Sequence, residues 1–139
     1  MKMPRRILLV DDEPGIRKMV GKRLQVAGFQ VTVSPDGEDA MLRVRKDPPD
    51  LVILDIMLPG VDGFTVCETL KQDARTRHVP IVLFSAKDSQ QDYRRGMAAG
   101  ADAYITKPYK PQDLEGLVVR MVEALSRTKP SQEGGNASV

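Results

Sequence analysis

The sequence has little of what marks a secreted, membrane or nucleic-acid-binding protein. Its one cysteine, Cys67, excludes an internal disulfide framework and fits a reducing compartment. It has no long apolar run, because the stretch Ile7–Val10 stops at Asp11 and is far too short for a signal peptide or a membrane span. Its positive and negative charges are also nearly balanced, and a formal net charge of +2 is too small to indicate a nucleic-acid or membrane surface. We therefore expect a cytoplasmic protein that contacts neither a membrane nor nucleic acid directly.

The chain is also too short for two substantial cores. Its 139 residues fit one compact domain, and no internal repeat is evident. After Ser126 the sequence is polar, rich in glycine and serine, and without periodicity. We expect one domain over residues 1–126 and a disordered tail or linker over residues 127–139.

What is present is a short apolar run that recurs along the chain. The runs ILLV, LVIL and IVLF lie before Asp11, Asp55 and Ser85, and each predicts a buried strand. Two further segments, QVTVS and AYITK, mix apolar with polar residues and suit the edges of a sheet. Segments with helical spacing lie between them; their expected starts are Pro14, SPDGED, VDGF and Pro111, and their expected ends are Gly28 and Gly100.

Strands that alternate with helices predict βαβ units and a parallel sheet covered on both faces. Continuous apolar strands belong in the middle of such a sheet. If the first, third and fourth strands are central, the strand order 2-1-3-4-5 fits the pattern. That order is the flavodoxin-like doubly wound α/β fold, although edge textures alone leave other orders open.

Three carboxylates follow the central strands of this predicted sheet. The strand order places a crevice at the carboxyl ends of the first and third strands, where Asp11, Asp12 and Asp55 lie. At an effective dielectric near 20, each pair of carboxylates some 4 to 6 Å apart repels by roughly 3 to 4 kcal/mol. Either protons or a cation must relieve this repulsion, and oxygen ligands with open positions suit Mg²⁺.

Two phosphate-binding groups are expected at the same edge of the sheet. The hydroxyl of Ser85 ends the fourth strand, and the ammonium of Lys107 follows the fifth. Aspartate is a nucleophile for phosphoryl transfer, while a metal and a lysine neutralise charge on the phosphoryl oxygens. Asp55 is therefore the candidate acceptor.

From Arg5 to Leu125 the chain resembles the receiver domains of two-component response regulators, of the single-domain kind found in chemotaxis and sporulation phosphorelays. The motifs that carry the resemblance are LLVDDE, LDIMLPGVDG, LFSAK and ADAYITKP, which occur in the family's order and at plausible separations. The resemblance implies that Asp55 accepts a phosphoryl group from a histidine kinase or a histidine phosphotransferase. It also implies a signalling phosphoprotein that catalyses its own phosphorylation and dephosphorylation and turns over no separate substrate.

The resemblance implies a role for each residue of the site. Asp12, Asp55 and the backbone carbonyl of Met57 would bind Mg²⁺, with Mn²⁺ as the alternative ion. Asp11 would orient a metal-bound water or bind directly. Lys107 would pair with Asp55 before phosphorylation and with a phosphoryl oxygen afterwards, and the peptide bond between Lys107 and Pro108 is expected to be cis.

The resemblance also implies a switch. The new phosphate would attract the Ser85 hydroxyl, and the vacated space would let Tyr104 turn inward. The face made by the fourth helix, fifth strand and fifth helix would then change and control a downstream protein, which Arg94 and Arg95 are placed to contact.

The resemblance further implies that two positions near the acceptor, Met57 and Lys87, tune the lifetime of the phosphoryl group. Methionine has no group that orients an attacking water. We therefore expect a longer-lived phosphoryl bond than in a relative with a polar amide at that position.

Each candidate residue has a simpler interpretation when taken alone. Asp12 suits the cap of the first helix, Ser85 a turn or helix cap, Asp55 a turn, and Lys107 the surface. Their joint placement at successive strand ends favours the functional interpretation. Cys67, at helical spacing with core residues, is expected to be a buried thiol, and His78 is a loop histidine without an evident partner.

Other functions and other states of the chain stay open. A phosphotransfer hydrolase would need an acid two residues after Asp55, where Met57 stands. An unphosphorylated scaffold should have lost one of the site residues, and all are present.

A stand-alone receiver is expected, with a piece of a longer regulator or hybrid kinase as the alternative. We expect a monomer, with a dimer formed on phosphorylation as the other state.

Overall fold

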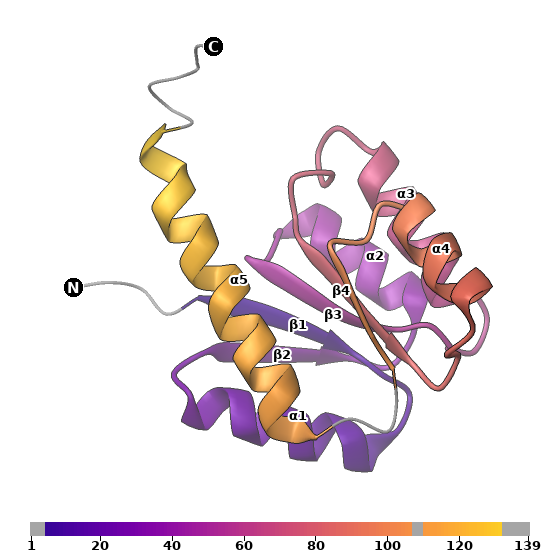
Figure 1. Cartoon of the computed structure of the whole chain (residues 1–139), viewed down its shortest axis with the longest axis horizontal. Helices are drawn as coiled ribbons and strands as arrows, with labels where there is room; N and C mark the ends of the chain where they lie inside the picture. Colours follow the sequence, from indigo (N-terminus) through magenta and orange to yellow (C-terminus); the bar gives the residue numbers. More distant parts are fainter. Residues whose placement is uncertain (1–4, 107–109, 132–139) are drawn as a thin grey trace.

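A parallel sheet forms the centre of the molecule, and helices cover both of its faces (Figure 1). The computed structural model describes residues 5–106 and 110–131. Over these residues the elements are β1 (Arg6–Val10), α1 (Pro14–Val26), β2 (Gln30–Ser34), α2 (Gly37–Lys46), β3 (Leu51–Asp55), α3 (Gly63–Gln72), β4 (Ile81–Ser85), α4 (Gln90–Ala98), β5 (Ala103–Thr106) and α5 (Pro111–Ser131). The strand order is β2-β1-β3-β4-β5, and every pair is parallel. The predicted flavodoxin-like order is confirmed.

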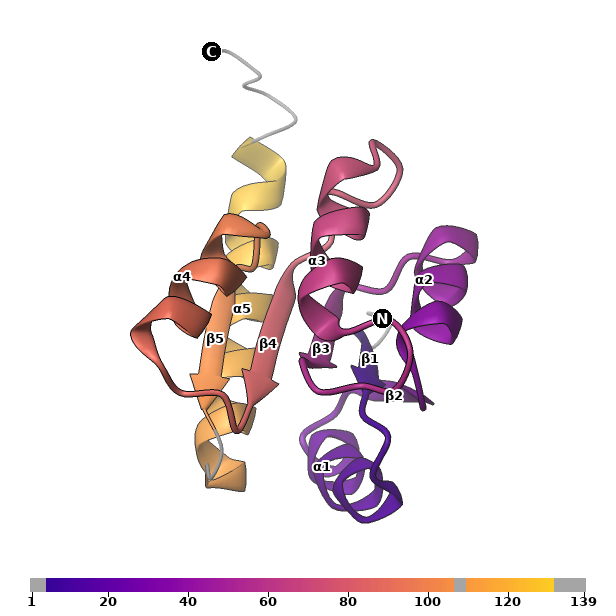
Figure 2. The same cartoon turned by 90° about the vertical axis from the view of Figure 1, so that its right-hand side faces the viewer.

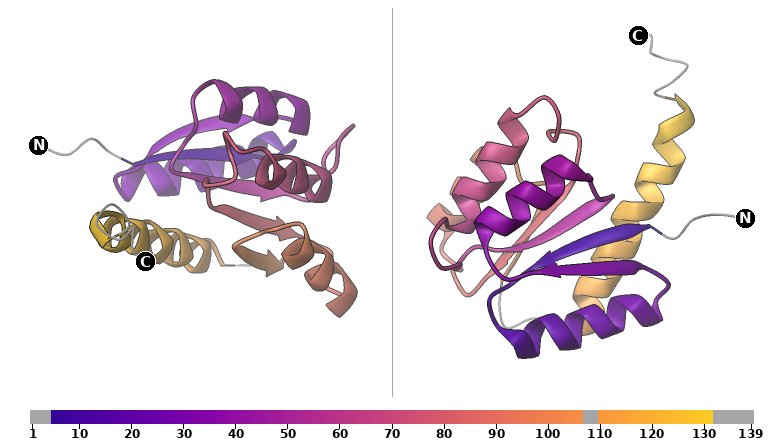
Figure 3. Two further views of the ribbon diagram at one scale, coloured as in Figure 1. Left: turned by 90° about the horizontal axis from the view of Figure 1, so that it is seen from above. Right: turned by 180° about the vertical axis from the view of Figure 1, so that it is seen from behind.

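The two faces of the sheet have separate cores. Helices α1 and α5 cover one face, and α2, α3 and α4 lie on the other (Figures 1 and 3). Side chains alternate along each strand, so Ile7 and Leu9 of β1 pack with α1 and α5, whereas Leu8 and Val10 pack with α2 and α3. Every residue of β3 and β4 is buried, as expected for central strands.

Local sequence signals set the helix ends. The side chains of Asp36, Asp62 and Ser89 accept hydrogen bonds from backbone N–H groups in the first turns of α2, α3 and α4. Gly28 and Gly100 follow α1 and α4 with φ of 104° and 100°, a conformation that glycine adopts without strain. The predicted starts and stops are confirmed.

The fifth helix is longer than the predicted domain. The expected boundary at residue 126 falls inside α5, which continues to Ser131. The predicted boundary lies where the apolar periodicity ends, and such a periodicity indicates which part of a helix packs rather than where the helix ends. The division into a domain and a tail stays a prediction.

The carboxyl ends of the strands meet at one edge of the sheet. Figure 2 shows the arrowheads of β3, β4 and β5 pointing to the same edge. The first residue of α3 lies against the residue that follows β3: Gly63 donates its N–H to the carbonyl of Ile56 (2.8 Å). A Cβ on Gly63 would lie 2.5 Å from the Ile56 Cα and also meet the Asp55 carbonyl oxygen. This close approach fixes the backbone on which Asp55 lies.

We predict that Gly63→Ala destabilises the fold, because the backbone of Asp55 and Ile56 cannot move aside without disturbing β3. The expected loss is about 1 to 3 kcal/mol in the free energy of unfolding, measured by urea denaturation. Gly15→Ala is the matched control, since a Cβ on Gly15 meets nothing within 4 Å. Equal effects of the two substitutions would contradict this interpretation.

Candidate functional site

Three carboxylates come together where β1 and β3 end. One oxygen each from Asp11, Asp12 and Asp55 lies within 4.8 Å of the others. Asp11 and Asp55 are buried, with 0% and 3% of their surfaces exposed, while Asp12 is exposed. The predicted convergence of these three side chains is confirmed by their positions.

The Asp11 side chain is held by the start of α1. The Asp11 Oδ1 accepts the backbone N–H of Glu13 (2.8 Å). The backbone N–H of Asp11 donates to the carbonyl of Ser34 in β2 (3.1 Å). Arg17 donates to the Asp11 carbonyl (2.7 Å). Glu13 occupies the N-cap position of α1. Asp12 does not cap the helix, so the simpler interpretation of this residue is wrong.

Asp55 is oriented by the turn that follows it. Its Oδ1 accepts the N–H of Met57 (3.1 Å), and the next residue, Ile56, donates to the carbonyl of Phe84 in β4 (3.1 Å). The turn interpretation of Asp55 is therefore correct as a local description. It also serves the site, because the same bond holds the carboxylate beside Asp11 and Asp12.

A hydrogen-bonded path runs from the end of β4 to β5. Ser85 is fully buried, and its hydroxyl oxygen accepts the N–H of Lys87 (3.1 Å). The carbonyl of Lys87 accepts the hydroxyl proton of Tyr104 (2.7 Å). One residue thus touches both predicted switch residues. The sequence predicts a role for Lys87 only in phosphoryl lifetime, because a backbone contact leaves no signal in residue types.

The Tyr104 ring packs closely against α4. A Cβ on Gly96 would lie 2.8 Å from the ring, and the Tyr93 ring centre is 5.7 Å away at 58°. Burial, together with the charges of Asp92 and Asp88, raises the pKa of Tyr104 above its ordinary value. The phenol therefore keeps its proton at neutral pH and remains a hydrogen-bond donor to Lys87.

A cavity of about 500 Å³ opens beside the carboxylates. It is lined by Asp12, Ile56, Met57, Leu58, Pro59, Asp62, Phe64, Lys87 and Arg95. The Arg95 guanidinium lies over the Phe64 ring, 4.3 Å from its centre. The sequence predicts Arg95 on a partner surface and gives no sign of this contact, because Phe64 belongs to a different helix 31 positions earlier in the chain.

Two predicted site residues, Lys107 and Pro108, lie outside the described residues. The role of Lys107 and the cis peptide bond stay predictions.

Cys67 is fully buried in α3, its thiol lies 3.6 Å from the Ala99 carbonyl oxygen, and burial raises its pKa to about 12. The prediction of a core thiol is confirmed, since such a group holds its proton and is a poor nucleophile. His78 is exposed.

The three carboxylates fit a hard divalent cation. Their oxygen atoms are the ligand type that Mg²⁺ prefers, and the exposed Asp12 leaves the site accessible from solvent. Met57 lines the cavity that also contains Asp12, which is consistent with the predicted carbonyl ligand. The ligand set itself stays a prediction.

Known proteins share this arrangement of the chain. A family model, the response regulator receiver domain, matches residues 7–119. The chain is 42% identical over 126 residues to the DNA-binding dual master transcriptional regulator RpaA of Synechocystis, covering 91% of this chain and 51% of that protein. It therefore spans about half the length of that curated relative.

Two solved structures illustrate other settings of the same fold. The receiver domain of a histidine kinase from Syntrophus aciditrophicus matches with a TM-score of 0.83 and 31% identity, over 89% of this chain and 94% of that one. The chemotaxis response regulator CheY4 of Vibrio cholerae matches with a TM-score of 0.80 and 30% identity, over 85% and 98%. No helix in residues 5–106 and 110–131 is long and apolar enough to cross a membrane.

We predict that Mg²⁺ stabilises the wild-type protein and stabilises Asp12→Asn less. A ligand at ten times its Kd adds about 1.4 kcal/mol to the stability of the native state. The substitution removes one negative charge. It therefore lowers the repulsion among the carboxylates in the absence of Mg²⁺ and weakens the binding of Mg²⁺. Thermal unfolding with MgCl2, against NaCl of equal ionic strength, measures both effects. Asp113→Asn, in the first turn of α5, is the control, and an equal Mg²⁺ response in Asp12→Asn would exclude a role for Asp12.

Proposed function

The chain belongs to the family of response regulator receiver domains, and we propose that Asp55 is its phosphoryl acceptor in two-component signalling. The observation that carries the proposal is the burial of Asp55 within 4.8 Å of two further carboxylates at the carboxyl edge of the sheet. The donor would be a phosphohistidine on a histidine kinase or a histidine phosphotransferase.

In the proposed step an oxygen of Asp55 attacks the phosphorus atom, and the bond between phosphorus and the histidine nitrogen breaks. The electron pair of that bond leaves with the imidazole, which then takes a proton. The Met57 N–H holds the attacking carboxylate in place through its bond to Oδ1. Asp11, Asp12 and Asp55 would hold Mg²⁺, which supplies positive charge to the phosphoryl oxygens when bound. Lys107 would supply a second positive charge.

The signal would pass through the peptide groups of Lys87. In the structure the Ser85 hydroxyl oxygen accepts the Lys87 N–H, and the Lys87 carbonyl accepts the Tyr104 hydroxyl proton. A phosphate on Asp55 would draw the Ser85 hydroxyl toward its oxygens. The bond from Lys87 would then have to change, and with it the position of the Tyr104 ring against α4.

The downstream partner would bind the face made by α4, β5 and α5. Tyr93 and Met97 on α4 are exposed, and Tyr93 lies next to Tyr104. Phosphorylation would raise the affinity for a partner that prefers the phosphorylated arrangement. By linkage, that partner would raise the equilibrium constant of phosphorylation by the same factor. The protein acts as a signalling switch, and in this proposal it catalyses only its own phosphorylation and dephosphorylation.

Incubation with acetyl phosphate and intact-mass spectrometry test the acceptor and the metal together. We expect one phosphoryl adduct on the wild type that requires Mg²⁺ and is absent from Asp55→Asn, because Asn has no nucleophilic carboxylate. Asp113→Asn should be modified as the wild type is. The absence of an adduct under all conditions, including with a phosphorylated kinase as the donor, would contradict the proposal and favour an unphosphorylated scaffold.

We further predict that Met57→Asn shortens the life of the phosphoryl group. Met57 is 56% exposed beside Asp55, so an amide there can orient a water for attack. The expected acceleration of hydrolysis is about tenfold, equal to ~1.4 kcal/mol in activation free energy. The loss of the adduct with time, followed by mass spectrometry, measures the rate. Met57→Leu is the matched apolar control, and no difference between the two variants would contradict a water-orienting effect.

A further inference from the structure

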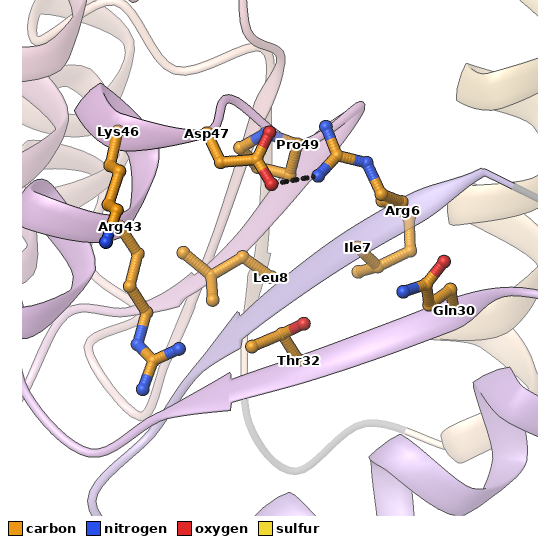
Figure 4. A pocket seen from close by; sticks show the side chains of 9 residues that line it. All are labelled: Arg6, Ile7, Leu8, Gln30, Thr32, Arg43, Lys46, Asp47 and Pro49. Atoms are coloured by element: carbon orange, nitrogen blue, oxygen red, sulfur yellow. Dashed lines mark hydrogen bonds and ion pairs between the residues drawn. The ribbon is translucent and has the colours of Figure 1, made fainter.

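A second hollow lies at the end of the sheet opposite the carboxylates, near the start of β1. Its volume is about 290 Å³. Figure 4 shows the residues that line it: Arg6, Ile7, Leu8, Gln30, Thr32, Arg43, Lys46, Asp47 and Pro49. They come from β1, β2, the last turn of α2 and the segment that follows it. None of them belongs to the proposed phosphorylation site.

The floor of the hollow is a part of the sheet that α2 leaves open. Leu8 and Thr32 are register partners in β1 and β2, as are Arg6 and Gln30, so the four residues lie on the same face. Leu8 is only 3% exposed, whereas Thr32 and Gln30 are exposed. The sheet surface is therefore covered at β1 and uncovered at the edge strand β2.

The rim of the hollow is cationic. Arg6 donates to Asp47 (2.7 Å) and to the Pro48 carbonyl (2.6 Å), which hold its guanidinium at the rim. Arg43 donates its Nε–H to Asp39 (2.6 Å), and its terminal nitrogens carry further N–H groups. Lys46 is exposed. The lining thus has three cations and one carboxylate, Asp47.

Among residues 5–106 and 110–131, β2 pairs with β1 on one side and with no strand on the other, so this strand beside the hollow has an open edge. The Gln30 N–H bonds the Arg5 carbonyl, and the Ser34 carbonyl accepts the Asp11 N–H, so these peptide groups point toward β1. Because alternate residues of a strand direct their peptide groups to opposite sides, those of Val31 and Val33 point outward. The segment Gln30–Ser34 contains no proline and no charged residue, which are common protections of an edge strand.

We propose that an extended, acidic segment of another protein adds to the sheet beside β2. Its backbone would bond the outward peptide groups of Val31 and Val33, and its carboxylates, spaced two residues apart, would face Arg43 and Lys46. A second copy of this chain is disfavoured as the occupant because it would bring the same cations to the contact. The proposal concerns a surface away from Asp55 and does not depend on phosphorylation.

The probe is an acetylated and amidated peptide of alternating valine and glutamate, added to ¹⁵N-labelled full-length protein. We expect the amide signals of Val31 and Val33 to shift and their hydrogen exchange to slow, since both N–H groups become bonded. Lys46→Glu should weaken peptide binding at least tenfold. Lys22→Glu, the same change at an exposed lysine of α1, should leave it unchanged.

A proline tests the backbone contact separately from charge. Val33→Pro removes an N–H that points away from β1, so the variant should stay folded by circular dichroism and lose peptide binding. Val33→Ala keeps that N–H and should bind. Equal binding of a valine-lysine peptide, unchanged binding by Val33→Pro, or unperturbed Val31 and Val33 amides would overturn the proposal. Shifts at these amides caused by protein concentration alone would identify a second copy as the occupant and also overturn it.

Discussion

The constraint on which the site depends is the mutual repulsion of three carboxylates held within 4.8 Å. Two of them, Asp11 and Asp55, are buried, so water screens their charges poorly. Backbone hydrogen bonds hold the two buried carboxylates in place. The N–H of Glu13, just before α1, bonds Asp11, and the N–H of Met57, in the turn after β3, bonds Asp55. A cation bound here would relieve this repulsion, and in the proposed function a phosphoryl group on Asp55 would alter the charge of the cluster.

The same rigidity explains how a local change of charge would reach a surface. Ser85 is buried at the end of a central strand, and the residue that bonds its hydroxyl also accepts the Tyr104 hydroxyl. Tyr104 has little freedom, because Gly96 leaves just enough room for its ring. Two hydrogen bonds through Lys87 therefore join Ser85 to Tyr104, which lies on the face made by α4, β5 and α5. Close packing favours two discrete arrangements over a gradual shift.

Patterns local in the sequence predicted most of the fold and part of the site. Apolar runs identified the central strands, and capping residues such as Asp62 identified helix starts, because both effects act over a few residues. The strand order inferred from the sequence then places Asp11, Asp12 and Asp55 together. Contacts between distant segments were not predictable: neither the Arg95 stack on Phe64 nor the Lys87 carbonyl contact has a sequence pattern. The end of α5 was also missed, since apolar periodicity reports packing and not the length of a helix.

The most direct test of the account is nuclear magnetic resonance of the Lys87 amide and the Tyr104 ring before and after phosphorylation in Mg²⁺. The account predicts that both sets of signals shift together in the wild type, because the two residues share one hydrogen-bonded path from the site. In Tyr104→Phe the Lys87 amide should still respond while the effect on α4 is reduced. A fully phosphorylated protein in which the Lys87 and Tyr104 signals stay unchanged would contradict the coupling of the carboxylate cluster to this face.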